Sequence, residues 1–151
     1  GGGDSVVASL PADVYDSLAY STLLLYNDPF GSGVLAERID DDFTNFSTTQ
    51  ANFRFFHVAK DLMAVDVYFD NVKVASNRQY VDNVMGGYHN LFQTRDPGFY
   101  TLSVKKAGSD SLILQTSTSF QQAQAYTILL SGVPRATGDH SLAVDILQAA
   151  N

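Results

Sequence analysis

Apolar and polar residues alternate along residues 53–76 with the period of a β-strand. From 65 to 69 every second residue is Val or Phe, which is the pattern of a strand with one buried face. Asp70-Asn71 follows, and both residue types tolerate the left-handed backbone of a two-residue hairpin turn. With this turn, two apolar pairs face each other: Phe69 with Val72, and Val67 with Val74. Turn chemistry and apolar pattern therefore predict the same β-hairpin in one register.

The rest of the chain contains further short strand patterns separated by turn signals. The predicted strands lie at 20–26, 34–39, 53–58, 88–94, 100–105, 112–118, 126–130 and 142–146. The first of them is mostly Leu and Tyr, so we expect it to be buried on both faces. Turn residues cluster at 27–33, and Asp96-Pro97-Gly98 has the residues of a tight turn.

No segment keeps a helical period for longer than about two turns, so helix should be scarce. Short strands with frequent turns are typical of a sandwich or a barrel. Because apolar and polar sides alternate so clearly, we predict an all-β fold in which two antiparallel sheets pack face to face, with eight to ten strands in total. We expect the apolar faces of the two sheets to pack against each other, which leaves no enclosed reactive centre.

The composition narrows the range of partners. Charged residues make up 17% of the chain, below the average of roughly 25%, so the exposed strand faces should be rich in Ser, Thr, Asn and Gln. Nine basic and sixteen acidic residues give a net charge of −7, which disfavours nucleic acids and anionic membrane surfaces as partners. The chain has no cysteine, which excludes disulfides, thiolate metal sites and cysteine nucleophiles.

The first residues predict an exported protein. The chain starts Gly1-Gly2-Gly3-Asp4-Ser5, and we expect residues 1–10 to form a flexible tether. This start resembles the stretch that follows the lipid-bearing cysteine of bacterial lipoproteins. The expected location is therefore periplasmic or outer-surface, with membrane contact only through a lipid anchor upstream of Gly1. A cloning remnant at Gly1 is the alternative. No apolar run approaches the ~20 residues of a membrane-spanning helix.

Four segments resemble a bacterial family known as domain of unknown function 4397. The most specific is Val65-Asp66-Val67-Tyr68-Phe69-Asp70-Asn71, and the others are 54–59, 97–102 and 125–132, in the order of the family. The resemblance covers about residues 53–147. The family usually has a Pro-rich loop where this chain has Lys60–Met63, and Gly where it has Asn71. The resemblance implies an immunoglobulin- or transthyretin-like sandwich on exported, often lipid-anchored proteins, and it implies no catalytic residues.

A length of 151 residues suits one domain. We therefore expect a single β-sandwich domain over residues 11–151. In this domain, residues 20–50 supply extra strands to the family-like core at 53–147.

One segment matches the letters of a dinucleotide-binding fingerprint, namely Gly31-Ser32-Gly33-Val34-Leu35-Ala36. That motif requires a preceding strand and a following crossover helix. Here Pro29-Phe30 precedes it and no helical pattern follows, so we interpret the segment as a turn.

The three histidines do not predict a metal or catalytic site. His57, His89 and His140 lie far apart, with no spacing that would bring two of them together. His57 follows Phe53 and Phe55 on one strand face, so we expect a satisfied or edge-exposed side chain. Asp139-His140 lacks a serine in a nucleophile-elbow context, and loop polarity explains the pair.

Acidic residues provide the best metal candidate. Asp40-Asp41-Asp42 offers hard oxygen ligands for calcium, but neighbours on an extended chain point to opposite sides and the distal Glu of known calcium loops is missing. We interpret the segment as a solvated acidic turn. Asp66 and Asp70 share a strand face, and we expect them to keep the solvent side of the hairpin polar.

Aromatic residues suggest one structural motif and one surface. Tyr126 follows a polar stretch at the start of a strand, which predicts a tyrosine corner with its hydroxyl bonded to nearby backbone. Phe56, Tyr68 and Phe99 fall on the face opposite the core of their strands. They are either buried beneath other segments, which we favour, or they form an aromatic patch for sugar or protein partners.

We therefore predict no catalytic, cofactor-binding or metal site. The first functional interpretation is a non-enzymatic, exported or cell-surface interaction module for a protein or a carbohydrate. The second is a structural domain of a surface assembly that pairs through sheet edges. The third is a carboxylate-dependent glycoside hydrolase, which needs two facing carboxylates, and Glu37 is the only glutamate.

Overall fold

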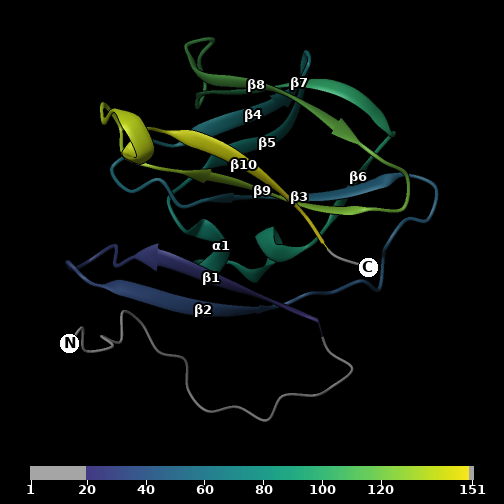
Figure 1. Ribbon diagram of the computed structural model, residues 1–151, viewed down its shortest axis with the longest axis horizontal. Helices are drawn as coiled ribbons and strands as arrows, with labels where there is room; N and C mark the ends of the chain where they lie inside the picture. Colours follow the sequence, from purple (N-terminus) through teal and green to yellow (C-terminus); the bar gives the residue numbers. More distant parts are fainter. Residues whose placement is uncertain (1–19, 150–151) are drawn as a thin grey trace. The chain divides into compact units, whose positions relative to one another are not determined.

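The structure, a computed structural model, describes residues 20–149, and Figure 1 shows how their strands are arranged. The chain divides into two compact units, one ending at Asp42 and one beginning at Phe43. The tether predicted for residues 1–10 lies outside the described residues. The division into a tether and a single domain stays a prediction.

The first unit is an antiparallel β-hairpin. It consists of β1 (Ser21–Asn27) and β2 (Val34–Asp40), close to the predicted bounds. The predicted burial of β1 on both faces is wrong, because Leu23 and Leu25 are 57% and 55% exposed. β1 and β2 form a two-stranded sheet of their own and bond to no other described strand. The expectation that residues 20–50 add strands to the sandwich core stays a prediction.

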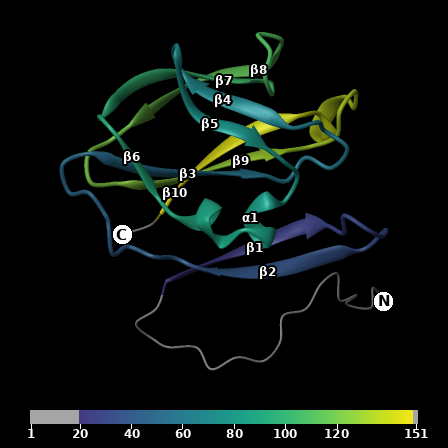
Figure 2. The ribbon, with the colours of Figure 1, turned by 180° about the vertical axis from the view of Figure 1, so that it is seen from behind.

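The second unit is a β-sandwich of two four-stranded sheets, which Figures 1 and 2 show as two layers. The β3 sheet has the order β10-β9-β3-β6, and the β4 sheet has the order β5-β4-β7-β8. The strands are β3 (Ala51–His57), β4 (Val65–Phe69), β5 (Val72–Arg78), β6 (Gln93–Arg95), β7 (Gly98–Lys106), β8 (Leu112–Phe120), β9 (Ala125–Ser131) and β10 (Ala143–Gln148). The predicted all-β sandwich is confirmed.

The sheets are not antiparallel throughout. Every pair in the β4 sheet is antiparallel, as predicted. In the β3 sheet, however, β3 and β9 run parallel, with Phe55 opposite Ile128. These two strands are far apart in the sequence and share no hairpin turn, so no local pattern indicates their direction.

The predicted β4–β5 hairpin is present, with register shifts between Val65 and Val67 and between Val67 and Tyr68. Asp70 has φ of 54°, the left-handed conformation expected for the turn. Phe69 pairs with Val72 as predicted. Val67, however, pairs with Ala75 instead of the residue before it, because a β-bulge shifts the register.

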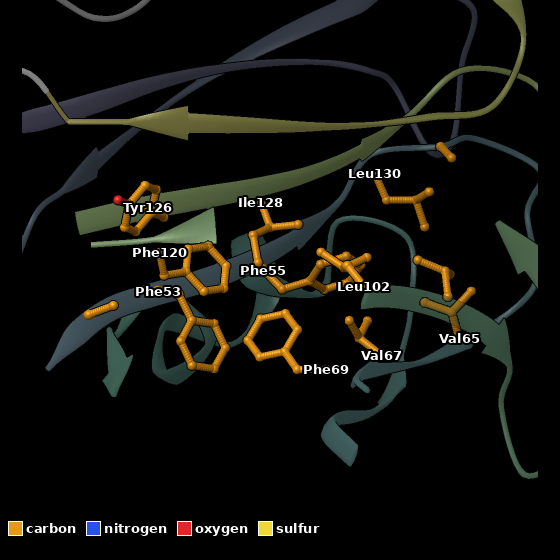
Figure 3. Close-up of a cluster of buried hydrophobic side chains, with 13 residues drawn as sticks. Phe53, Phe55, Val65, Val67, Phe69, Leu102, Phe120, Tyr126, Ile128 and Leu130 are labelled. Carbon is orange, nitrogen blue, oxygen red and sulfur yellow. The ribbon is translucent and has the colours of Figure 1, made fainter. Parts of the chain in front are cut away.

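Aromatic rings from both sheets fill the centre of the sandwich, and Figure 3 shows them facing one another. Ring centroids are 4.9 Å apart for Phe53 and Phe69, 5.2 Å for Phe69 and Phe120, and 4.8 Å for Phe120 and Tyr126. Aliphatic and aromatic side chains extend this core: Phe55, Val65, Val67, Leu102, Val104, Ile128 and Leu130. The apolar residues that alternate along the strands thus pack against each other between the two sheets.

The predicted tyrosine corner is confirmed. Tyr126 is 4% exposed, and its hydroxyl accepts the backbone N–H of Gln121 at 2.9 Å. The ring can therefore pack in the core while its polar end is satisfied by the connection that precedes β9.

Helix is scarce, as predicted, and most of it lies between β5 and β6. This segment, residues 79–92, is called the crossover here and contains α1 (Asp82–Met85) and the 3-10 turn η1 (Gly87–Asn90). The strand predicted at 88–94 is wrong except at its end, which enters β6. The Gly86 N–H bonds to the Asp82 carbonyl at 2.9 Å, so the chain turns locally where a strand would extend.

The crossover covers the outer face of β3. All seven residues of β3 are buried, although only Phe53 and Phe55 belong to the core cluster among its large side chains. On the other face, the Arg54 guanidinium lies over the Phe92 ring, 4.6 Å from its centroid. Arg54 Nη1 also donates to the Asn90 carbonyl at 3.3 Å. Within the described residues, no helix has the length and apolar character needed to cross a membrane.

Candidate functional site

An open pocket of about 480 Å³ lies between β5, the crossover and β6. It is called the crossover pocket here. Its lining residues are Val74, Ala75, Ser76, Arg78, Tyr88, His89, Leu91, Phe92 and Gln93. Apolar walls with a few polar groups are typical of sites that bind small molecules. This pocket is therefore the candidate functional site.

A buried ion pair positions the charged side of the pocket. Arg78 is 3% exposed and forms two parallel hydrogen bonds with Asp82, from Nε to Oδ2 at 2.8 Å and from Nη2 to Oδ1 at 2.7 Å. The Gln79 N–H also donates to Asp82 Oδ2 at 2.9 Å. Burial alone would raise the pKa of the Asp82 carboxyl, but the hydrogen bonds and charge of Arg78 lower this pKa. The pair is therefore rigid and close to neutral overall.

His89 and Tyr88 form the aromatic side of the pocket. Their ring centroids are 3.9 Å apart, and Tyr88 is 71% exposed. His89 Nε2 lies 3.6 Å from Asp82 Oδ2. Burial and the nearby charge of Arg78 lower the pKa of His89, although Asp82 opposes this. At neutral pH the imidazole is therefore uncharged and can both donate and accept hydrogen bonds.

The crossover pocket thus combines an exposed aromatic ring with polar groups in fixed positions. Gln93 adds an amide and Ser76 a hydroxyl. The carboxylate of Asp82 is held by the lining residue Arg78. Such an arrangement can stack on an apolar surface and exchange hydrogen bonds with hydroxyl or amide groups.

Asp66 is a buried structural charge, so the expectation that it lies on the solvent side of the hairpin is wrong. It is 1% exposed, and its Oδ2 accepts Lys73 Nζ at 2.7 Å and the Gly108 N–H at 3.1 Å. Its Oδ1 accepts the Asn77 N–H at 2.8 Å. Burial raises the pKa of Asp66, but these hydrogen bonds outweigh it and lower the pKa to about 2. The carboxylate thereby joins the β5 bulge to the β7–β8 turn.

The other acidic candidates have protein partners. Asp70 Oδ1 accepts the Thr101 N–H at 2.9 Å, on the exposed turn where we expected it. The Thr22 hydroxyl donates to Asp41 Oδ1 at 3.1 Å, and Asp40 ends β2 with its side chain 72% exposed. Across the residues that the structure describes, no three His, Asp or Glu side chains are placed to hold a metal ion.

Two of the three histidines lie near the same ion pair, which their sequence spacing did not indicate. His57 is completely buried, and its Nε2 is 3.3 Å from a backbone carbonyl oxygen. Burial lowers the pKa of His57, and the charges of Asp82 and Arg78 act on it as they act on His89. His140 lies apart from them in the turn η2, between β9 and β10.

The three aromatic residues on the outer strand faces have different surroundings. Phe56 is completely buried, as we favoured. Tyr68 is partly buried, with Lys105 Nζ 4.7 Å and Lys73 Nζ 5.5 Å from its ring centroid. Phe99 is 90% exposed. They do not form one aromatic patch.

The predicted turn at Gly31-Ser32-Gly33 is confirmed. These residues lie in the loop between β1 and β2, where Asp28 Oδ1 accepts the Phe30 N–H at 2.8 Å. A Cβ at Gly31 would lie 2.6 Å from Asp28 Oδ2, so a larger residue there would displace the Asp28 side chain. The antiparallel hairpin lacks the crossover helix of a dinucleotide-binding unit.

Residues 51–149 match the model of a family described as Domain of unknown function (DUF4397). The chain belongs to this family. The match begins at the first residue of β3 and includes both sheets of the sandwich and the crossover pocket, which confirms the resemblance noted over residues 53–147. A search of curated proteins gives no significant match.

In this DUF4397 domain, the residues of the crossover pocket were not among the predicted site residues. The reason is that the crossover has neither the period of a strand nor that of a helix. One signal was present: Arg78 and Asp82 are opposite charges four positions apart, in a segment that ends at Gly86-Gly87. Their ion pair connects the end of β5 to the first residue of α1.

Proposed function

We propose that this DUF4397 domain is a non-enzymatic, exported interaction module that binds a neutral carbohydrate in the crossover pocket. The observation that carries the proposal is the exposed Tyr88 ring beside the rigid Arg78–Asp82 pair, in a pocket of about 480 Å³. Sugars present an apolar C–H face and a rim of hydroxyl groups. An aromatic ring next to fixed polar groups is complementary to both.

The charge of the pocket favours a neutral ligand. Arg78 is already paired with Asp82, and His89 is uncharged at neutral pH because its pKa is lowered. The lining therefore offers no free cation to an anionic ligand, and the net charge of −7 adds long-range repulsion. Hydroxyl groups, in contrast, can bond to the Gln93 amide and the His89 ring.

The geometry supports binding over glycoside hydrolysis. A hydrolase of the usual kind needs two carboxyl groups across the scissile bond, and one of them must have a raised pKa to act as an acid. The carboxyl group of Asp82, which is bonded to the lining residue Arg78, has a lowered pKa and is therefore unsuited to the role of the acid. The exported location rests on the resemblance to exported proteins, and fractionation of cells that express the native protein tests it.

Titration of the protein with soluble neutral oligosaccharides, followed by calorimetry, tests the binding. We expect Tyr88→Ala to weaken binding by about tenfold or more, because a buried aromatic contact is lost. Gln93→Ala should weaken it less. Phe99→Ala is the matched control, since Phe99 is also an exposed aromatic residue but does not line the pocket. Binding that survives Tyr88→Ala unchanged, or a broad glycan panel without a ligand, would reject the proposal.

A further inference from the structure

The β8 strand leaves one side of its backbone open. It is the end strand of the β4 sheet, and β7 is its only described partner. Every second N–H and C=O along this nine-residue strand therefore points away from the sheet. Its sequence, Leu-Ile-Leu-Gln-Thr-Ser-Thr-Ser-Phe, contains no charged residue and no proline.

The other edges of the described sandwich are guarded against strand addition. β5 carries the exposed Lys73, β6 has only three residues, and β10 carries the exposed Asp145. Charges and short length are features that keep sheet edges from pairing. Among the described edges of the sandwich, β8 is thus the one that has the length and the neutral sequence of a pairing strand.

Two exposed apolar side chains lie at opposite ends of β8. Phe99, on β7, pairs with Ser119 and is 90% exposed, while Leu112 pairs with Lys105 and is 53% exposed. The register shifts by one residue at this end of β8, because Leu114 pairs with Val104 but Leu112 pairs with Lys105, which leaves Ile113 as an extra residue. Directly paired residues share a face of the sheet, and Phe99 and Lys105 share a face of β7 because an even number of positions separates them. Phe99 and Leu112 therefore lie on the same outer face, one near each end of the open edge.

We infer that two copies of this chain pair antiparallel through β8 around a two-fold axis and form one continuous eight-stranded sheet. An antiparallel pair places the start of one β8 beside the end of the other. Phe99 of each copy then lies near Leu112 of the partner subunit, with only the small Ser119 between their strands. Two strand spacings separate them, roughly 9–10 Å, which the two long side chains can span across a serine.

The occupant is a second copy because the edge is complementary to itself. A two-fold interface uses the same patch twice, so each patch must contain both halves of every contact. Phe99 and Leu112 meet that condition from opposite ends of β8. The charges near the edge are also compatible with pairing, although each chain carries −7 overall. Asp110 lies just before the start of β8. Antiparallel pairing places it beside the neutral Gln121 and Gln122 of the partner subunit, so no like charges meet there.

Sedimentation velocity at rising concentration tests the pairing. Because a single strand edge is a small interface, we expect dimers to appear between about 10 μM and about 1 mM. Ser117→Lys should abolish them, since it places lysines close together across the two-fold axis on an exposed position of β8. Asn71→Lys is the matched control, because it adds the same charge at the β4–β5 turn, at the other edge of the sheet. Thermal melting of each variant verifies that it is folded.

A mixing experiment tests the contact itself. Phe99→Ser or Leu112→Ser removes both Phe–Leu contacts from a homodimer, and each should weaken dimerisation by about tenfold. An equimolar mixture of the two variants restores one complete contact in the mixed dimer. We therefore expect the mixture to dimerise more tightly than either variant alone.

Three results would overturn the inference. The first is a wild-type protein that stays monomeric through the whole concentration range. The second is a dimer that Ser117→Lys leaves intact, or an oligomer larger than a dimer, because two-fold pairing consumes the edge. The third is a mixture of the two serine variants that dimerises no better than its components. The outcome is independent of carbohydrate binding, since no residue changed here lines the crossover pocket.

Discussion

The core between the two sheets and the crossover beside it are held together differently. In the core, Phe53, Phe69 and Phe120 are at most 2% exposed and contact one another through their rings. In the crossover, partly exposed Asp82 forms an ion pair with buried Arg78 at the end of β5, and Tyr88 projects outward. Apolar contacts stabilise the first region and specific polar bonds the second.

The two regions also differ in how well their polar groups are satisfied. The buried side-chain atoms that lack a hydrogen-bond partner are His57 Nδ1, Asn83 Nδ2 and Oδ1, and Asn90 Oδ1. Among the described residues, all of these lie in the crossover or at the end of β3 beside it. Each such group lowers stability by about 1–3 kcal/mol. The crossover should therefore open at a lower free energy than the sheets, which suits a segment that lines the proposed binding pocket.

Removing an aromatic ring from the core should have the largest effect. Phe69 is completely buried and contacts the rings of Phe53, Tyr100 and Phe120. We expect Phe69→Ala to lower the free energy of unfolding by about 3–5 kcal/mol, because it leaves a cavity. Urea denaturation measures this. The control is Phe99→Ala, measured below about 10 μM where the protein is expected to be monomeric. Its expected change is within about 0.5 kcal/mol because the ring is 90% exposed. Equal effects at the two positions would contradict the assignment of the core.

A substitution of Asp66 tests how much a buried carboxylate stabilises the fold when its hydrogen-bond donors are present. We expect Asp66→Asn to destabilise the protein by about 2–3 kcal/mol, because an amide places a donor against the donors of Lys73, Asn77 or Gly108. The folded-state pKa is about 2, below the ordinary 3.8. The carboxylate therefore stabilises the fold above pH 3.8, and about 2 kcal/mol is lost as the pH falls through 2.

Denaturation curves between pH 6 and pH 2 measure that loss. The wild-type protein should lose stability in the acid window, and the Asp66→Asn variant should lose less of it, with a difference of about 2 kcal/mol. Parallel pH curves for the two proteins would show that Asp66 is not the titrating group.

A substitution of Asn83 tests whether the polar groups of the crossover that lack hydrogen bonds lower the stability of the protein. Its side chain is completely buried and both polar atoms lack partners. We expect Asn83→Leu to raise the free energy of unfolding by about 1 kcal/mol, since an apolar side chain of similar volume needs no hydrogen bond. Thermal and urea denaturation measure the change. A loss of stability larger than about 1 kcal/mol would mean that Asn83 is well bonded in solution.

The smallest expected effect is on the titration of His89. Burial and Arg78 lower its pKa, while Asp82 raises it. NMR titration of the imidazole should therefore give a pKa below 6.5 in the wild-type protein. In Asp82→Asn the pKa should fall further, because the one charge that favours the protonated ring is removed. An increase in the variant would place His89 away from this ion pair.

Much of the sandwich could be predicted from local pattern. The β4–β5 turn at Asp70 and the tyrosine corner at Tyr126 depend on residues within a few positions of each other, and both are present. The bulge that moves Val67 opposite Ala75 was not visible, because it depends on how Asp66 is enclosed by β5 and the β7–β8 turn. The crossover pocket was missed for a similar reason: its residues are brought together by contacts between segments.

The sequence alone determined which faces of the strands are apolar and where the chain turns. Those properties arise from side-chain alternation and from backbone preferences of a few adjacent residues. Only the tertiary structure decided that β9 lies parallel to β3, that Asp66 is buried and that Arg78 meets Asp82 beside a pocket. Neighbours of that kind are selected by the packing energy of distant segments, which no local pattern encodes.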